Sequence, residues 1–367
     1  MASSSAATSR AVEVLAGKLK RRQVVGSREA ALETLLVLRQ VVSRARFSNI
    51  EQLVGLIRDV GKKLAEAQPK EHTIGNIVRK VLHNIREEYN TATRGAASAP
   101  SRNVYSISMF VLQGQPRKHE IAPKSEATIS LKENDTEDPD SFAKGIKPVL
   151  MEAIQDVLDE IETVYDNVSK TAKDHIHSDE IILTIGHSKT VEAFLKSAAH
   201  SRNYSVIVAE TGPSYSGQDM ATSLSSAGIS TFLVPDSSIY AIMSRVNKVI
   251  IGAHAVLANG GMFAITGSLL AATAARAHST PVVVCAGQFK LTPLWNLYHE
   301  YGALDFGDPS SVLGFEEGSL VNKVDVINPY YDYVGPELVD VYITNDGDHP
   351  PTSVYRQVDI LIYWTFF

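Results

Sequence analysis

The chain has 367 residues, of which 44% are hydrophobic and 21% are charged, and its formal net charge is −6. This composition is ordinary for a globular protein large enough for two domains, and the acidic balance gives no reason to expect nucleic acid or an anionic membrane as partner. The single cysteine, Cys285, excludes a disulfide framework and a cysteine-based zinc site. Neither a secretory h-region nor a run of about 18 apolar residues is present, so we expect a cytosolic protein.

Helical periodicity dominates residues 1–172, which we predict to form an N-terminal helical domain. Apolar residues recur three, four and seven positions apart, as on one face of an α-helix, within the segments 28–46, 53–64, 74–85 and 146–164. Residues 91–144 lack this pattern and include a stretch rich in Ala, Ser and Thr and an acidic run. Such a composition buries too little apolar surface to offset the entropy of ordering, so we expect a flexible insertion there.

From Ile181 the pattern changes to short apolar runs that alternate with helical segments. Strands are predicted at residues 181–186, 204–210, 230–235, 248–253, 281–286 and 338–344. Continuous apolar runs are typical of strands buried on both faces, and their alternation with helices implies parallel crossovers. We therefore predict that residues 173–367 form a Rossmann-like α/β domain, a mainly parallel sheet with helices on both faces. Residues 357–367 are an atypical apolar tail, which would dock or aggregate if exposed.

Candidate site residues lie in the loops that follow the predicted strands, because open parallel sheets bind ligands beyond the carboxyl ends of their strands. They are Gly186, His187, Ser188, Thr190, Asp236, His254, Asn259 and Gly260. Free backbone N–H groups at helix starts attract a small phosphate or carboxylate. A structural interpretation stays open for the same residues: the hydroxyls and the Asp236 carboxylate can cap helices, Asn259 and Gly260 can form a turn, and a histidine can pack.

Motifs with a known catalytic mechanism are missing from the sequence. No G-x-G-x-x-G follows the first strand, and no Walker loop, H-E-x-x-H or G-x-S-x-G occurs. Cys285 lies within an apolar strand and is predicted to be inert core. His175 and His177 have no third ligand nearby in sequence, which is weak support for a metal site. We therefore expect no catalytic residue, no metal and no cofactor.

Several long segments resemble the beta subunits of eukaryotic translation initiation factor 2B, the guanine-nucleotide exchange complex for initiation factor 2. They are TLLVLRQVVSRARF at 34–47, IGNIVRKVL at 74–82, MSRVNKVIIGA at 243–253 and LANGG at 257–261. The resemblance implies a regulatory subunit that assembles through its α/β domain with the delta subunit, in a complex that also holds alpha, gamma and epsilon subunits. It further implies that the subunit binds the alpha subunit of initiation factor 2 and senses its phosphorylation.

The same fold is similar to that of the methylthioribose-1-phosphate and ribose-1,5-bisphosphate isomerases. Those enzymes carry a cysteine, an aspartate, an arginine and a lysine at positions that correspond here to Gly186, His254, Gly212 and Ile265. Replacement of all four implies that proton-transfer isomerisation is lost, so an enzyme is not expected. A sugar-phosphate sensor or isomerase of this family remains the alternative.

Overall fold

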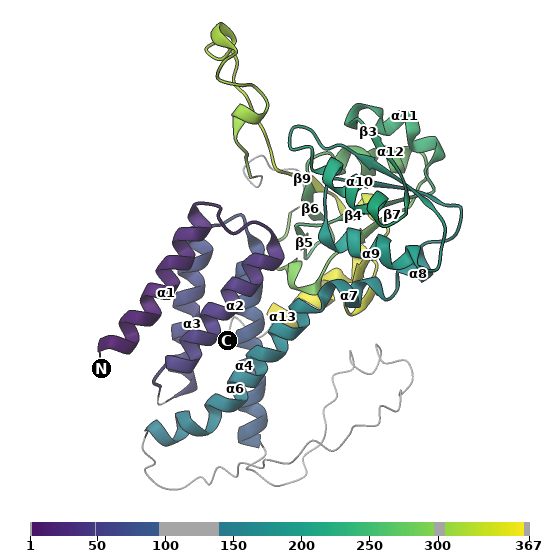
Figure 1. The fold of residues 1–367 in the computed structure, drawn as a ribbon. Coiled ribbons are helices and arrows are strands. Elements are labelled where there is room, and N and C mark those ends of the chain that lie inside the picture. The colour runs from purple at the N-terminus through teal and green to yellow at the C-terminus, as the bar shows by residue number, and fades with distance from the viewer. Residues whose placement is uncertain (1, 48, 95–138, 297–304, 363–367) are drawn as a thin grey trace.

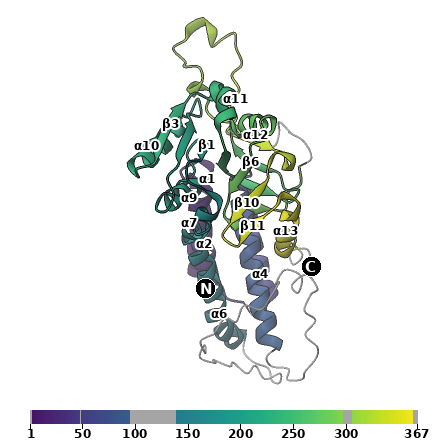
Figure 2. The same cartoon turned by 90° about the vertical axis from the view of Figure 1, so that its right-hand side faces the viewer.

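The computed structural model describes residues 2–47, 49–94, 139–296 and 305–362. Its first half is a bundle of long helices that extends from one end of an α/β unit (Figures 1 and 2). The bundle comprises α1 (Ala2–Lys20), α2 (Ser27–Arg44), α3 (Ile50–Ala67), α4 (His72–Arg94) and α6 (Pro139–Glu162). Short helices α7 (Val164–Ser169) and α8 (Ala172–His175) then lead from α6 into the sheet. The helices predicted from apolar spacing are confirmed.

Helix α3 illustrates how the sequence forms these elements. Its side chains Leu53, Ile57 and Leu64 are fully buried, because residues three, four and seven positions apart share one face of a helix. At its start, the side-chain oxygen of Asn49 accepts a hydrogen bond from the backbone N–H of Glu51 at 3.3 Å. Burial of this single stripe fixes the helix against its neighbours α1 and α4.

The α/β half holds a seven-stranded sheet with the strand order β11-β10-β7-β4-β1-β2-β3. The strands are β1 (Ile181–Ile185), β2 (Ser205–Ala209), β3 (Ser230–Val234), β4 (Lys248–Gly252), β7 (Val282–Cys285), β10 (Val341–Thr344) and β11 (Gly347–His349). All neighbours are parallel except β10 and β11. The predicted fold class is confirmed, although the last predicted strand begins at Val341 because residues 336–338 form a 3-10 turn.

Helices cover both faces of this sheet. One face is covered by α9 (Lys189–Ala199) and α10 (Ser216–Ser226), and the other by α11 (Ile239–Ile242) and α12 (Ser268–Ala277). Alternate strand residues point to opposite faces, so Ile182 and Leu183 belong to two different buried clusters. The cluster that contains Ile182 continues through α7 into the helical bundle. The bundle and this face of the sheet therefore share one apolar core.

A second, four-stranded sheet was not predicted from the sequence. Its order is β8-β5-β6-β9, with β8 (Leu291–Thr292), β5 (Ala255–Leu257), β6 (Met262–Ile265) and β9 (Tyr331–Val334). Strands of two to four residues carry too little periodicity to stand out in a sequence. This sheet lies over the carboxyl end of β4, since β5 follows β4 after only two residues.

Two predicted segments are only partly described. Helix α4 reaches Arg94 and α6 begins at Pro139, so both margins of the predicted insertion 91–144 are helical, and its remainder lies outside the described residues. Helix α13 (Val354–Ile362) covers the first part of the predicted tail and buries Val358, whereas residues 363–367 lie outside the description. The boundary at residues 172–173 stays a prediction. Within the described ranges, no helix is long and apolar enough to cross a membrane.

Candidate functional site

A cleft of about 760 Å³ lies between the helical bundle and the carboxyl edge of the seven-stranded sheet. Its bundle wall is formed by residues 22, 24–29, 68, 70 and 71, and its sheet wall by the loops that follow β1, β2 and β4. Four predicted site residues line it, namely His187, Ser188, Thr190 and His254. The volume is within the range of about 300–1,000 Å³ that is usual for small-molecule sites.

The loop after β1 carries three of these residues into the start of α9. Gly186 adopts a positive φ of 60°, which turns the chain at the end of the strand. The Ser188 side-chain oxygen then accepts a hydrogen bond from the backbone N–H of Val191 at 3.5 Å. Thr190 is buried on the first turn of the helix. The capping interpretation is therefore correct for Ser188.

His187 belongs to a network around the carboxylate of Glu192. Its Nε2 lies 2.8 Å from Glu192 Oε2, while Lys196 Nζ donates to Oε1 at 2.7 Å and the Ser223 hydroxyl donates to the same oxygen. Burial of Glu192 acts to raise its pKa, but the hydrogen bonds from Lys196, Ser223 and His187 outweigh it and lower the pKa to about 2. His187 thus ties the loop after β1 to α9, whereas Ser223 joins α9 to α10.

Asp236 holds the loop after β2 through two hydrogen bonds to its backbone. Its Oδ1 accepts the backbone N–H of Thr211 at 2.9 Å, and its Oδ2 accepts that of Gly212 at 2.7 Å. No side-chain hydrogen bond caps the 3-10 helix that begins at Asp236. The capping prediction for this residue is therefore wrong, because its two oxygens bind a loop that is distant in sequence. Gly212 lines the cleft, whereas Asp236 lies outside its lining.

His254 connects the sheet to the helical bundle. Its Nε2 lies 3.1 Å from the carbonyl oxygen of Lys70, and its Nδ1 lies 3.2 Å from Ser27 Oγ. Because a carbonyl oxygen only accepts, Nε2 carries the proton, and Nδ1 accepts a hydrogen bond from the Ser27 hydroxyl. The ring also stacks on Tyr331, with centroids 4.1 Å apart and planes 15° apart. The imidazole therefore has a structural partner at both nitrogens and on its face.

His72 is a second imidazole at this junction that sequence reasoning missed. It stacks on Phe263 at 5.8 Å between centroids and lies 6.3 Å from the ring of His254. Burial, followed by the proximity of His254, lowers the pKa of His72 to about 4, so the ring is neutral at physiological pH. No sequence signal links His72 to this place, because it starts a bundle helix far along the chain from β4.

Asn259 and Gly260 do not reach the cleft. The Asn259 amide donates to Tyr333 Oη at 2.9 Å and to the carbonyl oxygen of Asn296. Gly260 has a φ of 82°, and its carbonyl oxygen accepts the Tyr342 hydroxyl at 2.7 Å. Both residues form the turn between β5 and β6, so the turn interpretation is correct and the structure separates them from the other candidates.

Charges on the described lining of the cleft nearly balance. The lining contains Arg22, Arg28, Lys70, Lys189 and Lys290 against Glu29, Glu71, Asp305 and Asp308. Arg22 donates to Asp305 Oδ1 at 2.6 Å, and Lys189 donates to Glu29 Oε1 at 2.8 Å. Lys290 donates to the carbonyl oxygen of Ala253 at 2.7 Å, and burial lowers its pKa to about 8. These cations are already bound by protein acceptors, which weakens their attraction for a phosphate.

Neither a reactive thiol nor a metal cluster is found among the described residues. Cys285 is fully buried in β7, and burial raises the pKa of its thiol, so the prediction of inert core is confirmed. His175 Nε2 lies 3.0 Å from Asp348 Oδ2. Within the described ranges, no three His, Cys, Asp or Glu side chains are grouped so that they could hold a metal ion.

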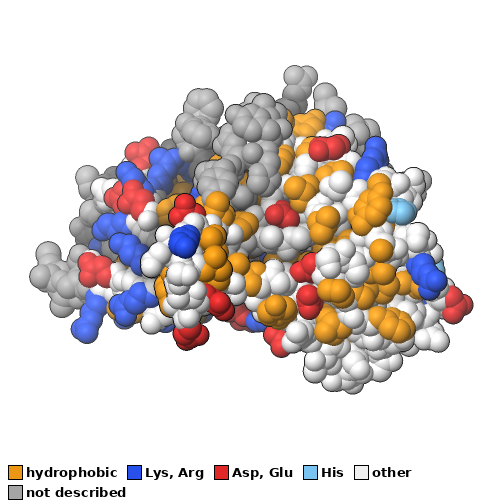
Figure 3. Space-filling model, turned by 90° about the horizontal axis from the view of Figure 1, so that it is seen from above, with side chains coloured by type: hydrophobic (Ala, Val, Ile, Leu, Met, Phe, Trp, Pro, Cys, Tyr) orange, Lys and Arg blue, Asp and Glu red, His pale blue; other side chains and the backbone are white. Residues whose placement is uncertain are grey.

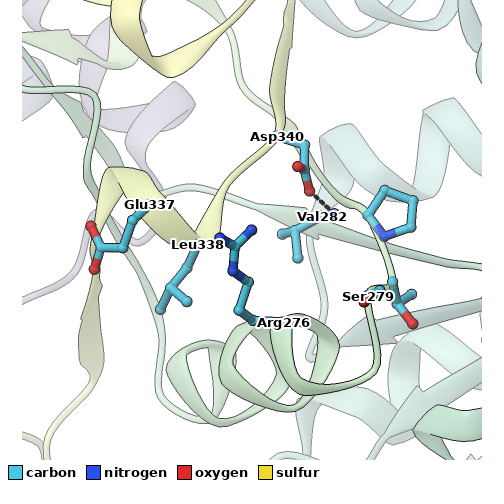
Figure 4. A pocket seen from close by; sticks show the side chains of 8 residues that line it. Arg276, Ser279, Val282, Glu337, Leu338 and Asp340 are labelled. Carbon is cyan, nitrogen blue, oxygen red and sulfur yellow. Dashed lines mark hydrogen bonds between the residues drawn. The ribbon is translucent and has the colours of Figure 1, made fainter.

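A smaller cavity of about 270 Å³ lies at the opposite, amino edge of the sheet. Figure 4 shows Arg276, Glu337 and Asp340 around it. Asp340 Oδ2 accepts the backbone N–H of Val282 at 2.7 Å and so joins the starts of β10 and β7 (Figure 4). Since this carboxylate has a structural partner, we assign no ligand to the cavity.

Residues 23–351 match the model of the initiation factor 2 subunit family. The chain belongs to this family. It is 41% identical over 370 residues to translation initiation factor eIF2B subunit beta of Schizosaccharomyces pombe, with 94% of each chain covered. It also resembles, with a TM-score of 0.69 and 28% identity, a chain of the solved tetrameric eIF2B-beta2-delta2 complex from C. thermophilum, covering 96% of this chain and 95% of that one.

The more distant relatives of this chain include an enzyme. The ribose 1,5-bisphosphate isomerase of Thermococcus kodakarensis is 24% identical over 349 residues, with 95% of this chain and 92% of the enzyme covered. Of the four positions that the sequence resemblance matched to isomerase residues, two are packed together here, since a Cβ on Gly186 would lie 2.9 Å from Ile265 Cδ1. The other two are bonded within the protein, His254 to the bundle and Gly212 to Asp236.

Proposed function

We propose that the chain is a non-catalytic regulatory subunit of the cytosolic guanine-nucleotide exchange complex for initiation factor 2. The observation that carries the proposal is the 41% identity to an eIF2B beta subunit across 94% of both chains. The cleft supports it, because the polar groups at its sheet edge hold loops and helices together instead of standing free for proton transfer.

Assembly with a delta subunit through the α/β half is part of the proposal. It is supported by the beta2-delta2 composition of the solved relative. The α/β half also exposes apolar side chains, with Phe232 56% and Leu233 47% exposed on edge strand β3 and Tyr240 58% exposed on α11. Figure 3 shows hydrophobic side chains gathered over this half of the molecule. Patches of this kind mark interaction surfaces in soluble proteins.

The regulatory step would be a coupling between partner binding and the state of the complex. In the proposal the helical bundle contributes to the surface that holds the alpha subunit of initiation factor 2, and exchange catalysis belongs to other subunits. A phosphate on that partner adds about −1.5 to −2 charges, which changes its interaction with nearby cations. The resulting coupling free energy would set the exchange rate.

The test compares the assembled complex with initiation factor 2 whose alpha subunit is phosphorylated or unphosphorylated. We expect the affinity to differ between the two forms by at least about 5-fold, the lower end of typical allosteric coupling. A complex assembled without this chain is the control, and it should lose the discrimination. Equal affinity for both forms in the full complex would contradict the proposal.

A sugar-phosphate sensor or isomerase is the second candidate. The open cleft of about 760 Å³ at the carboxyl edge of the sheet, with Lys290 on its wall, favours it. Incubation with ribose 1,5-bisphosphate separates the possibilities. Turnover supports an isomerase, and a rise in the melting temperature without turnover supports a sensor. We expect neither result, because the lining cations are already bonded to the protein.

A further inference from the structure

Residues 305–330 form an arm that projects away from both the bundle and the sheet, as the upper loop in Figures 1 and 2. Its regular structure is limited to 3-10 turns at Pro309–Ser311 and Gly318–Leu320. Large apolar side chains are nevertheless exposed along it: Val312 by 54%, Phe315 by 78%, Leu320 by 46%, Val324 by 46% and Ile327 by 59%. Such a concentration of exposed apolar groups on one projecting segment indicates a contact surface.

The base of the arm is held firmly. The backbone N–H of Gly307 donates to the carbonyl oxygen of Asn328 at 2.7 Å, and that of Tyr330 donates to Asp305 at 2.8 Å. Asp305 also receives Arg22 of the bundle at 2.6 Å, and the Arg22 guanidinium lies 5.2 Å from the centre of the Tyr330 ring. Since β9 (Tyr331–Val334) begins directly after the arm, the second chain segment of the base continues into the four-stranded sheet. An anchored base reduces the freedom that the arm loses when a partner binds.

The charge of the arm indicates what kind of surface it fits. Its charged residues between Gly307 and Asn328 are Asp308, Glu316, Glu317, Lys323 and Asp325, four acidic against one basic. An anionic membrane would repel this segment. A protein surface with an apolar centre and Lys or Arg at its rim would complement both its apolar and its acidic groups.

We propose that the arm is a docking element that seats on an apolar, basic-rimmed surface of the α/β domain of a delta-type subunit. This inference rests on the proposed function. The solved relative is a beta2-delta2 tetramer, and the arm rises from the same half of the molecule that carries the exposed strand β3. A second copy of this chain is a poorer partner, because its surface also carries a net negative charge, −6 for the whole chain, and would repel the acidic arm.

The test measures the affinity of the full-length chain for the delta-type subunit of its own organism. Val312→Glu and Phe315→Glu should each weaken binding by roughly 30-fold or more, as expected for an apolar anchor at the centre of an interface. Val14→Glu is the matched control, because Val14 on α1 is the same residue type and is also 54% exposed. It should bind like the unaltered chain. Phe315→Ala, which adds no charge, should weaken binding by roughly 10-fold.

Each outcome decides a separate point. If the unaltered chain does not bind the delta-type subunit, the proposed function fails. If it binds, and the Val312 and Phe315 variants bind equally well, only the arm proposal fails. The proposal also fails if the Phe315 variants melt below the unaltered chain, since the side chain would then pack within its own chain, or if they disrupt self-association alone. The double variant Glu316→Lys, Glu317→Lys should associate with the delta-type subunit more slowly than the unaltered chain. An association rate of the unaltered chain that does not change with salt concentration would contradict the basic rim.

Discussion

Replacement of His254 by alanine tests whether this residue of the cleft is structural. The change removes the N–H that is bonded to the Lys70 carbonyl oxygen at 3.1 Å and the acceptor for the Ser27 hydroxyl at 3.2 Å. Each such hydrogen bond contributes a net stability of about 1 kcal/mol. Loss of the ring stacked on Tyr331 removes about 0.5–1.5 kcal/mol more. The variant should therefore lose about 3 kcal/mol of unfolding free energy.

Unfolding in guanidinium chloride measures this loss, with His187→Ala as the control. His187 pairs with Glu192 at the surface, where both side chains remain partly exposed, so its removal should cost less than about 1 kcal/mol. If the His254 variant lost no more stability than the His187 variant, the claim that His254 ties the sheet to the bundle would be refuted.

Three further predictions concern residues elsewhere in the chain. In α3, the added methyl group of Gly55→Ala enters open space, so this variant should be more stable by about 0.5–1 kcal/mol. Gly61→Ala places a Cβ 2.6 Å from Val78 Cγ1, and this overpacking should cost about 1–3 kcal/mol of stability. Equal melting temperatures of the two variants would contradict this packing. The folded-state pKa of His72, about 4, lies below its ordinary 6.5, so its contribution to stability is complete above pH 6.5 and is lost as the pH falls toward 4. His72→Gln should flatten the stability curve in that window, and an unchanged slope measured by thermal unfolding would exclude the effect. Cys285 is fully buried, so a thiol reagent should label it only after unfolding; rapid labelling of the native chain would show otherwise.

The sequence was informative where one segment determines its own structure. The runs at β1, β2 and β4 are mostly apolar because both faces of these strands are covered, and that pattern predicted a parallel sheet. Ser188 was recognisable as a cap because its partner, Val191, is three residues away. The direction of the parallel strands alone predicted that the cleft lies at the carboxyl edge of the sheet.

Contacts between distant segments could not be predicted in this way. The partners of Asp236 lie in the loop after another strand, and those of His254 lie in the helical bundle. The same limit applies to Lys290 and His72, which reach the junction from the ends of elements far apart in the chain. Asn259 and Gly260 were grouped with the cleft because they follow the fourth predicted strand, β4, but their turn contacts Tyr333 and Tyr342 of later strands.

The native mass and composition of the tagged chain, purified gently from its own cells, test the central claim most directly. We predict a complex of several hundred kilodaltons that holds four other subunit types and releases initiation factor 2 at high salt. Recovery of the chain alone, or as a small homo-oligomer, would contradict its assignment as a regulatory subunit of the exchange complex.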